Sequence, residues 1–390
     1  AASTDQDLVA MVAAYLAKVG VKMEIQVMEY PAHLSAQGTK THAAGFHFNT
    51  GHSNPTTGMR KNFQTGLDVI ALSKDKEALR EVDCVLGLDI KDFEKATHEL
   101  EKTKREVAPI VKADADWMEM GFAEVNMSKW AMDYCRMQPC SVRALGDTSL
   151  GVPVLIEVLE ERIAADPALQ AKIAERKARI GKRHDETWAK WQEEARKDWD
   201  AAPMTTARLA MEVWDVIKDE DWVLTANTLK HGVRKLWDFD KAYRHPGIEL
   251  GTSTQIGMSM GVALAHKKAG RLVVDLQPDG DLMFDAGALW VAAKYEIPML
   301  IVMYNNRAYY NDWEHQIRMA RQRGTDVNKA HIGMDLFGPE PDFGALARSM
   351  GVYGEGPFED PKDVRAALLR AIEVVKSGKP ALIDTVTRHR

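Results

Sequence analysis

The chain has 390 residues, of which 45% are hydrophobic and 28% charged, a mixture typical of a soluble globular protein with room for two domains. Its formal net charge of -6 argues against a nucleic-acid partner, because binding a phosphate backbone needs clustered Lys and Arg. No apolar run reaches the length of about 18 residues that a membrane span needs. The three cysteines form no C-x-x-C pair, and the first residues indicate an amphipathic helix instead of a signal peptide, so we expect a cytoplasmic protein.

The first 165 residues predict an α/β domain. Hydrophobic periodicity predicts a helix over 7–19, a strand over 22–28 and a long loop over 30–60. Short strands are expected over 82–88, 123–127 and 141–144, and a helix over 152–163. Residues 166–203 are dense in Lys, Arg, Glu and Ala, which predicts an exposed helical connector whose tryptophans pack onto a neighbouring domain.

A second α/β domain is predicted over 204–390. Helices are expected over 206–217, 251–266, 284–295, 342–350 and 361–377, and strands over 222–226, 271–277, 299–304 and 381–386. Continuous apolar strands separated by helices predict a parallel sheet covered on both faces. The fold class we expect is therefore α/β, with two domains that each contain a parallel sheet flanked by helices.

Two polar motifs follow neighbouring strands of this second domain. Asp279 and Gly280 follow the strand 271–277, and Asn306 ends the next β–α–β unit. A right-handed crossover brings these strand ends together at the edge where parallel sheets bind ligands. A helix that begins there suits a phosphate, but an aspartate beside a phosphate needs a cation between them. Carboxylate and amide oxygens are hard ligands, which predicts Mg²⁺ or Ca²⁺.

The segment PDGDLMFDAGALWVAAKYEIPMLIVMYNN resembles the cofactor motif of thiamine diphosphate enzymes, in which G-D-G is followed by a spacer and N-N. Its ALW-x-A-A-x-Y-x-I-P stretch is similar to that of the acetolactate synthase and benzoylformate decarboxylase group. The resemblance implies thiamine diphosphate and Mg²⁺ as cofactors, with the metal held by Asp279, Asn306 and the carbonyl of Ala308. It also implies diphosphate contacts from the turn at Gly280, Asp281 and Leu282. Pro278 replaces the first glycine, so one backbone N–H is lost.

Two further segments resemble parts of the same family. GTSTQIGMSMG, at 251–261, resembles the loop that passes under the cofactor, which implies cofactor contacts from Thr254 and from Ile256 as the aliphatic wedge, with Thr252 as the rival wedge. WVLTANTLKH, at 222–231, resembles the first strand and its diphosphate-capping loop. It implies cofactor contacts from Asn227, Thr228 and His231, although Asn and Leu replace the family's Asp and Gly.

Three residues after the asparagine pair are candidates for facing the substrate: Tyr309, Tyr310 and His315. The alternative is that they begin an ordinary surface helix. The catalytic residue itself is not identified, because in this family it is a glutamate on a separate pyrimidine-binding domain. Residues 1–165 instead resemble the family's central domain, incomplete at its start. The resemblance therefore implies a partner chain or segment that carries the pyrimidine domain, within a homo- or hetero-oligomer. The alternatives are that this chain is a cleaved or truncated piece of a longer protein, or that the domain assignment is wrong.

The resemblance implies a lyase, carboligase or decarboxylase that cleaves or forms C–C bonds in a small-molecule substrate, a 2-keto acid or 2-hydroxy ketone. An alternative is an enzyme similar to 2-hydroxyacyl-CoA lyase or oxalyl-CoA decarboxylase, since T-Q-I-G-M-S-M-G also resembles their loop. Such an enzyme needs basic residues near CoA, for which Lys40, Arg60 and Lys61 are the candidates. A second alternative is a cofactor-binding subunit without catalytic activity.

Overall fold

A computed structural model of the chain describes residues 76–90, 97–101, 106–121, 138–226, 229, 232–245 and 253–389. The elements predicted over 7–60 and 123–127 lie outside these ranges. The described residues include no helix long and apolar enough to cross a membrane.

The earlier described part contains a small parallel sheet, in the order β1-β4-β5, and a two-stranded antiparallel pair. Its elements are α5 (Lys76–Glu81), β1 (Cys84–Leu88), β2 (His98–Glu101), β3 (Glu106–Pro109), β4 (Asp116–Met120) and β5 (Val142–Ala144). β1 and β5 correspond to predicted strands. The pattern did not predict β2, β3 or β4, because their charged residues interrupt the apolar runs that indicate a buried strand.

Two helices follow, α7 (Thr148–Ala165) and α8 (Pro167–Ala195). Asp166 separates them: it ends α7 and caps α8, its side chain accepting hydrogen bonds from the N–H groups of Ala168 and Leu169. Most of α8 is exposed, as expected for a charged connector. Two tryptophans near its end contact cations of the following residues: the Lys235 ammonium lies 5.3 Å from the Trp191 ring and the Arg208 guanidinium 3.7 Å from the Trp199 ring.

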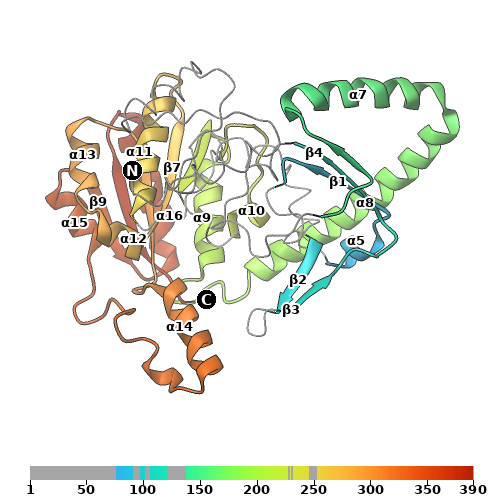
Figure 1. Cartoon of the computed structure of the whole chain (residues 1–390). Helices are drawn as coiled ribbons and strands as arrows, with labels where there is room; N and C mark the ends of the chain where they lie inside the picture. Colours follow the sequence, from blue (N-terminus) through green and yellow to red (C-terminus); the bar gives the residue numbers. More distant parts are fainter. Residues whose placement is uncertain are drawn as a thin grey trace, which may run out of the picture. The chain divides into compact units, whose positions relative to one another are not determined.

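The later part is built on a five-stranded parallel sheet, of which Figure 1 labels β7 and β9. The strand order is β6-β7-β8-β10-β9. Its strands are β6 (Trp222–Ala226), β7 (Leu272–Pro278), β8 (Leu300–Asn305), β9 (Tyr353–Phe358) and β10 (Ala381–Val386). β6, β7, β8 and β10 are almost wholly buried, because helices cover both faces of the sheet. The predicted α/β class with parallel sheets is confirmed.

The sequence pattern did not predict β9, which has two glycines and a proline in six residues. Gly354 is needed there because a Cβ at this position would lie 2.4 Å from the carbonyl oxygen of Gly344 in α15 (Phe343–Ser349). The close approach of strand and helix therefore selects residues that usually indicate a turn.

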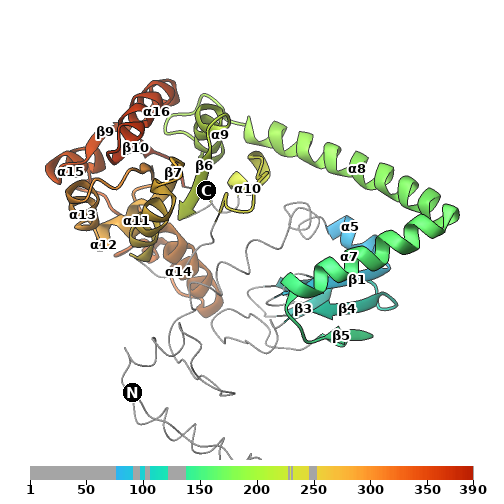
Figure 2. The same ribbon diagram turned by 90° about the horizontal axis from the view of Figure 1, so that it is seen from above.

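The helices form two layers, one on each side of the sheet (Figure 2). One layer contains α9 (Thr206–Ile217), α10 (Gly232–Leu236) and α16 (Pro361–Lys376); the other contains α11 (Thr254–Lys267), α13 (Ala288–Lys294) and α15. Alternate strand residues face the two layers, so that Val274 packs in the first and Val273 in the second.

The helix predicted over 284–295 is wrong in its bounds. The chain instead forms α12 (Asp279–Phe284), breaks at Asp285, and forms α13. α12 starts directly after β7, which places its first residues at the carboxyl edge of the sheet. α14 (Tyr310–Arg323) begins at the same edge, shortly after β8.

Candidate cofactor and metal site

Asp279 links the ends of two neighbouring strands. It is the first residue of α12 and its side chain is 1% exposed. One carboxylate oxygen accepts a hydrogen bond from the N–H of Gly280 at 2.9 Å, and the other accepts from the N–H of Ala308 at 3.1 Å. The carboxylate therefore lies beside the segment that follows β8, 29 positions further along the chain.

Burial raises the pKa of Asp279 to about 7, although backbone N–H groups of Gly280, Ala308 and Arg307 oppose this shift. None of the groups that lower this pKa within the described ranges is a cationic side chain. A divalent cation would supply the missing counter-charge and favour the carboxylate form.

The two asparagines after β8 differ in their surroundings. The Asn305 amide donates to the Asp384 carboxylate at 3.2 Å, and its oxygen accepts from the N–H of Arg307 at 3.1 Å. Asn305 is therefore satisfied within the fold. The amide oxygen of Asn306 is buried and has no hydrogen-bond partner in the described part of the chain. Because buried polar atoms normally have a partner, this oxygen fits a metal ligand.

Ala308 forms an isolated antiparallel bridge with Asp335. The hydrogen bonds of this bridge come from flanking residues: Tyr309 N–H donates to the Met334 carbonyl at 2.7 Å, and Leu336 N–H donates to the Arg307 carbonyl at 2.8 Å. The N–H and carbonyl of Ala308 therefore point away from Asp335, and the N–H reaches Asp279. In extended backbone a residue's N–H and carbonyl share one side, so the carbonyl faces the Asp279 side.

A carboxylate, an amide oxygen and a backbone carbonyl thus lie on the two segments that a hydrogen bond joins at this edge, and hard oxygens of this kind fit Mg²⁺. The described ranges hold no cluster of three or more His, Cys, Asp or Glu side chains that could bind a metal. A cation held here would therefore share its remaining coordination positions with oxygens of a bound ligand or water.

Tyr309 packs against the start of α12. A Cβ at Gly280 would lie 2.5 Å from Cδ1 and 2.7 Å from Cε1 of the Tyr309 ring, so only glycine leaves room for the ring. The edge of the same ring meets Phe284, with centroids 5.6 Å apart. Tyr309 therefore lies beside the proposed metal site.

The other two substrate-facing candidates lie on α14. The Tyr310 ring stacks on the His389 imidazole, with centroids 4.7 Å apart, and His315 is exposed. His389, which follows β10, was not predicted as a site residue. Nothing in the local pattern distinguishes it, since its contacts arise from distant residues.

The first turn of α11 is tied to α12. Ser253, which precedes α11 in a left-handed conformation with φ of 71°, donates its N–H to the Asp281 carboxylate at 3.4 Å, and Thr254 follows as the first helical residue. Ile256, the predicted wedge, is 0% exposed and packs in the core layer that also contains Leu282. Its side chain is thus part of the hydrophobic core, and its role toward a cofactor stays a prediction.

Asn227, Thr228, His231 and Thr252, like the CoA candidates Lys40, Arg60 and Lys61, lie outside the described residues. Two of their neighbours are informative: Ala226 and Leu229 have φ values of 61° and 47°, in the left-handed region. Leu229, where the resemblance expects glycine, has a backbone conformation that favours glycine. Strained residues of this kind concentrate at functional sites.

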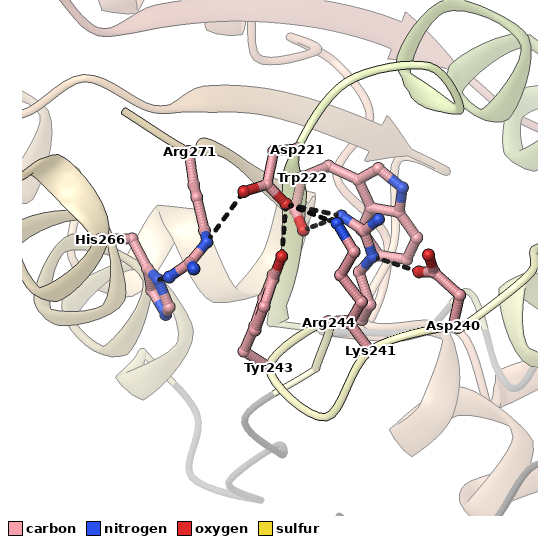
Figure 3. Close-up of polar contacts among 8 residues, drawn as sticks. All are labelled: Asp221, Trp222, Asp240, Lys241, Tyr243, Arg244, His266 and Arg271. Carbon is pink, nitrogen blue, oxygen red and sulfur yellow. Dashed lines mark hydrogen bonds and ion pairs between the residues drawn. The ribbon is translucent and has the colours of Figure 1, made fainter. Parts of the chain in front are cut away.

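The opposite ends of β6 and β7 are fixed by a polar cluster around Asp221 (Figure 3). Its carboxylate accepts hydrogen bonds from the Tyr243 hydroxyl at 2.6 Å, Arg271 Nε at 3.1 Å and Arg244 at 3.3 Å. The Arg244 guanidinium also donates to the Trp222 carbonyl at 2.8 Å. This cluster holds the amino ends of the two strands whose carboxyl ends carry the candidate site.

Comparison with known proteins adds an independent observation. Residues 230–385 match the family described as "Thiamine pyrophosphate enzyme, C-terminal TPP binding domain". The chain is 26% identical over 242 residues to a protein of Methanocaldococcus jannaschii named as a probable acetolactate synthase large subunit, covering 59% of this chain and 37% of that protein. It is 26% identical over 178 residues to the acetolactate synthase isozyme 3 large subunit of Escherichia coli, covering 44% and 29%.

Among solved structures, an enzyme from Mycobacterium smegmatis described as thiamin diphosphate-dependent matches with a TM-score of 0.50 and 15% identity. The match covers 82% of this chain and 51% of that one, and it shows a common fold. The chain spans about a third of the length of the curated relatives that it matches.

Proposed function

We infer that the chain is a member of the thiamine pyrophosphate-dependent superfamily that is related to acetolactate synthase large subunits. On that basis we propose that it holds thiamine diphosphate and Mg²⁺ at the carboxyl edge of its five-stranded sheet. The proposed reaction is C–C bond cleavage or formation by a lyase, carboligase or decarboxylase. The observation that carries the proposal is the Asp279 carboxylate, buried without a cationic partner in the described residues and bonded to the segment after β8.

We assign the metal to three oxygens: the Asp279 carboxylate, the Asn306 amide oxygen and the Ala308 carbonyl. The start of α12, at Gly280, Asp281 and Leu282, would face the diphosphate. When bound, thiamine diphosphate supplies a carbon nucleophile for a substrate carbonyl and an electron sink for the carbanion that follows.

We further propose that residues 1–165 form a central domain, 166–203 a connector and 204–390 the cofactor domain, and that the catalytic glutamate comes from a pyrimidine domain on a partner chain or segment. Large apolar side chains support a partner on the layer of α11 and α13. Leu264 is 52% exposed, Phe284 62%, Trp290 54% and Tyr295 65%. Contacts between α11 and its neighbours α12 and α13 place Leu264, Phe284 and Trp290 on adjoining helices, and Tyr295 directly follows α13. Exposed apolar groups beside an incomplete site suit an interface.

The proposed substrate is a 2-keto acid or 2-hydroxy ketone, because the curated relatives are named as acetolactate synthase large subunits. No described residue favours a CoA thioester. A rise in melting temperature on addition of CoA would support that alternative. A cofactor-binding subunit without activity would bind the cofactor but show no turnover even with a pyrimidine-domain partner added.

Isothermal titration calorimetry on the full chain tests the site. We expect thiamine diphosphate to bind only with Mg²⁺ present, and Asp279→Asn or Asn306→Ala to weaken binding at least about tenfold, since each removes a metal ligand. Asn311→Ala, an exposed residue on α14, is the matched control and should bind normally. Normal Mg²⁺-dependent binding by both site variants would refute the assignment.

A further inference from the structure

Gln277 lies near the end of β7, close to the proposed metal site, and its side chain faces the interior of the domain. It precedes Pro278 at the end of β7 and lies two positions before Asp279. Val273 packs in the layer of α11, α13 and α15, and Gln277, four positions later on the same strand, faces that layer too. Its register partner on β8 is Met303, another residue of this core.

The Gln277 amide is fully buried but poorly bonded. The residue is 0% exposed, and its oxygen Oε1 has no hydrogen-bond partner among the described residues. Within the described part of the chain, its nitrogen Nε2 donates a single long bond, 3.5 Å, to the Pro278 carbonyl. An apolar side chain of the same size would fill this space without leaving a buried acceptor unsatisfied.

Unsatisfied amide oxygens occur on both strands next to Asp279. Asn306, which follows β8, has the same kind of buried oxygen, and β7 and β8 are adjacent at this edge, with Pro278 in register with Tyr304. Asn305 shows the contrast, because both ends of its amide are bonded within the fold. Within the described ranges, the proposed site therefore has a buried amide oxygen without a partner on the β7 side, from Gln277, and another on the β8 side, from Asn306.

We propose that Gln277 is a further ligand-contacting residue, whose Oε1 accepts a hydrogen bond from an N–H or O–H donor of the organic ligand bound at this edge. The donor is either the exocyclic amine of the cofactor's aminopyrimidine or a hydroxyl of the substrate. A neutral amide oxygen suits such donors, because it offers an acceptor without adding charge beside the carboxylates of the site. This inference rests on the proposed function.

The test is Gln277→Met, which keeps the length of the side chain and removes its hydrogen bonds. The full chain without ligand should be as stable as the wild type or more stable in thermal and urea unfolding, because a buried unsatisfied acceptor has been removed. The Kd for thiamine diphosphate, measured by calorimetry with Mg²⁺, should rise about 5- to 10-fold, the effect of one neutral hydrogen bond. Gln316→Met, on the exposed side of α14, is the control and should change neither quantity.

A second arm separates the two sources of the donor. If the Kd for the cofactor is unchanged but acetoin, a 2-hydroxy ketone whose hydroxyl can donate, binds more weakly to the cofactor-loaded variant, the partner of Gln277 is the substrate. Lower stability of the variant together with unchanged binding of both ligands would overturn the inference, since the amide would then be bonded within the protein. Failure of the wild-type chain to bind thiamine diphosphate would overturn the proposed function and this inference with it.

Discussion

Replacement of Gly280 by alanine should reveal how tightly the Tyr309 ring packs against the start of α12, beside the proposed metal site. The new Cβ would lie 2.5 and 2.7 Å from two carbons of the Tyr309 ring, well inside contact distance. Overpacking of this kind destabilises proteins by about 1–3 kcal/mol. Gly280 has no left-handed φ and lies in α12, so alanine itself is favoured there by about 0.5–1 kcal/mol. The net expectation is a loss of roughly 0.5–2 kcal/mol.

The sign of this effect should depend on the tyrosine. In a Tyr309→Ala background the ring is gone, and Gly280→Ala should then stabilise the chain by about 0.5–1 kcal/mol. Urea unfolding of the wild type, both single variants and the double variant gives the interaction energy between the two positions, expected at about 1–3 kcal/mol. Gly261→Ala in α11 is the matched control, because no atom lies within 4 Å of its Cβ position, and it should stabilise either background equally. Additive effects of the two substitutions would refute the packing argument.

Three further predictions concern acid groups and the partner. Burial raises the pKa of Asp384 to about 6, above its usual 3.8, so the stability contributed by its protonated form is present below about pH 4 and is lost as pH rises through 6. Over this window the free energy of unfolding of the wild type should fall by about 3 kcal/mol relative to that of Asp384→Asn. Parallel pH profiles of the two proteins in urea unfolding would contradict this. Asp221→Ala should lower the free energy of unfolding by only about 1 kcal/mol, and by less at high salt, because this carboxylate is partly exposed. A loss above about 3 kcal/mol in urea unfolding would show that solvent does not screen the charges of the cluster in Figure 3. The purified chain alone should show no turnover with a 2-keto acid and gain it when a polypeptide carrying a pyrimidine domain is added; turnover by the chain alone would refute the need for that domain.

Most of the cofactor domain could be predicted from its apolar runs. Helix 206–217 and the strands 222–226 and 381–386 agree with α9, β6 and β10 residue for residue, because buried parallel strands have continuous apolar sequences. The pattern failed where a tertiary contact selects the residue. Gly354 in β9 is required because α15 approaches the strand too closely for a Cβ. Asp285 ends α12, which separates it from α13 within a segment whose apolar pattern predicts one helix.

The residues of the candidate site that directly follow strands could be predicted from the sequence. Asp279 and Ala308 are brought together by the β–α–β connection, which the alternation of elements already predicts. The contact of Tyr309 with Gly280 and the unsatisfied amide of Gln277 were not predictable, since they depend on side-chain packing between strands. The roles of Asn227, Thr228 and His231 stay predictions.

The layer of α11, α13 and α15 covers a sheet face that has several buried acid groups. Asp275 and Asp384 are 0% exposed and Asp279 is 1% exposed, and burial raises the pKa of all three. Each carboxylate there opposes folding at neutral pH, since desolvation penalises its charged form. Of these three, Asp279 is the one that accepts from the N–H of Ala308, so a cation held at the proposed site would relieve that penalty for Asp279. Binding of the metal should therefore stabilise the fold by more than its contacts suggest, because it also removes an uncompensated buried charge.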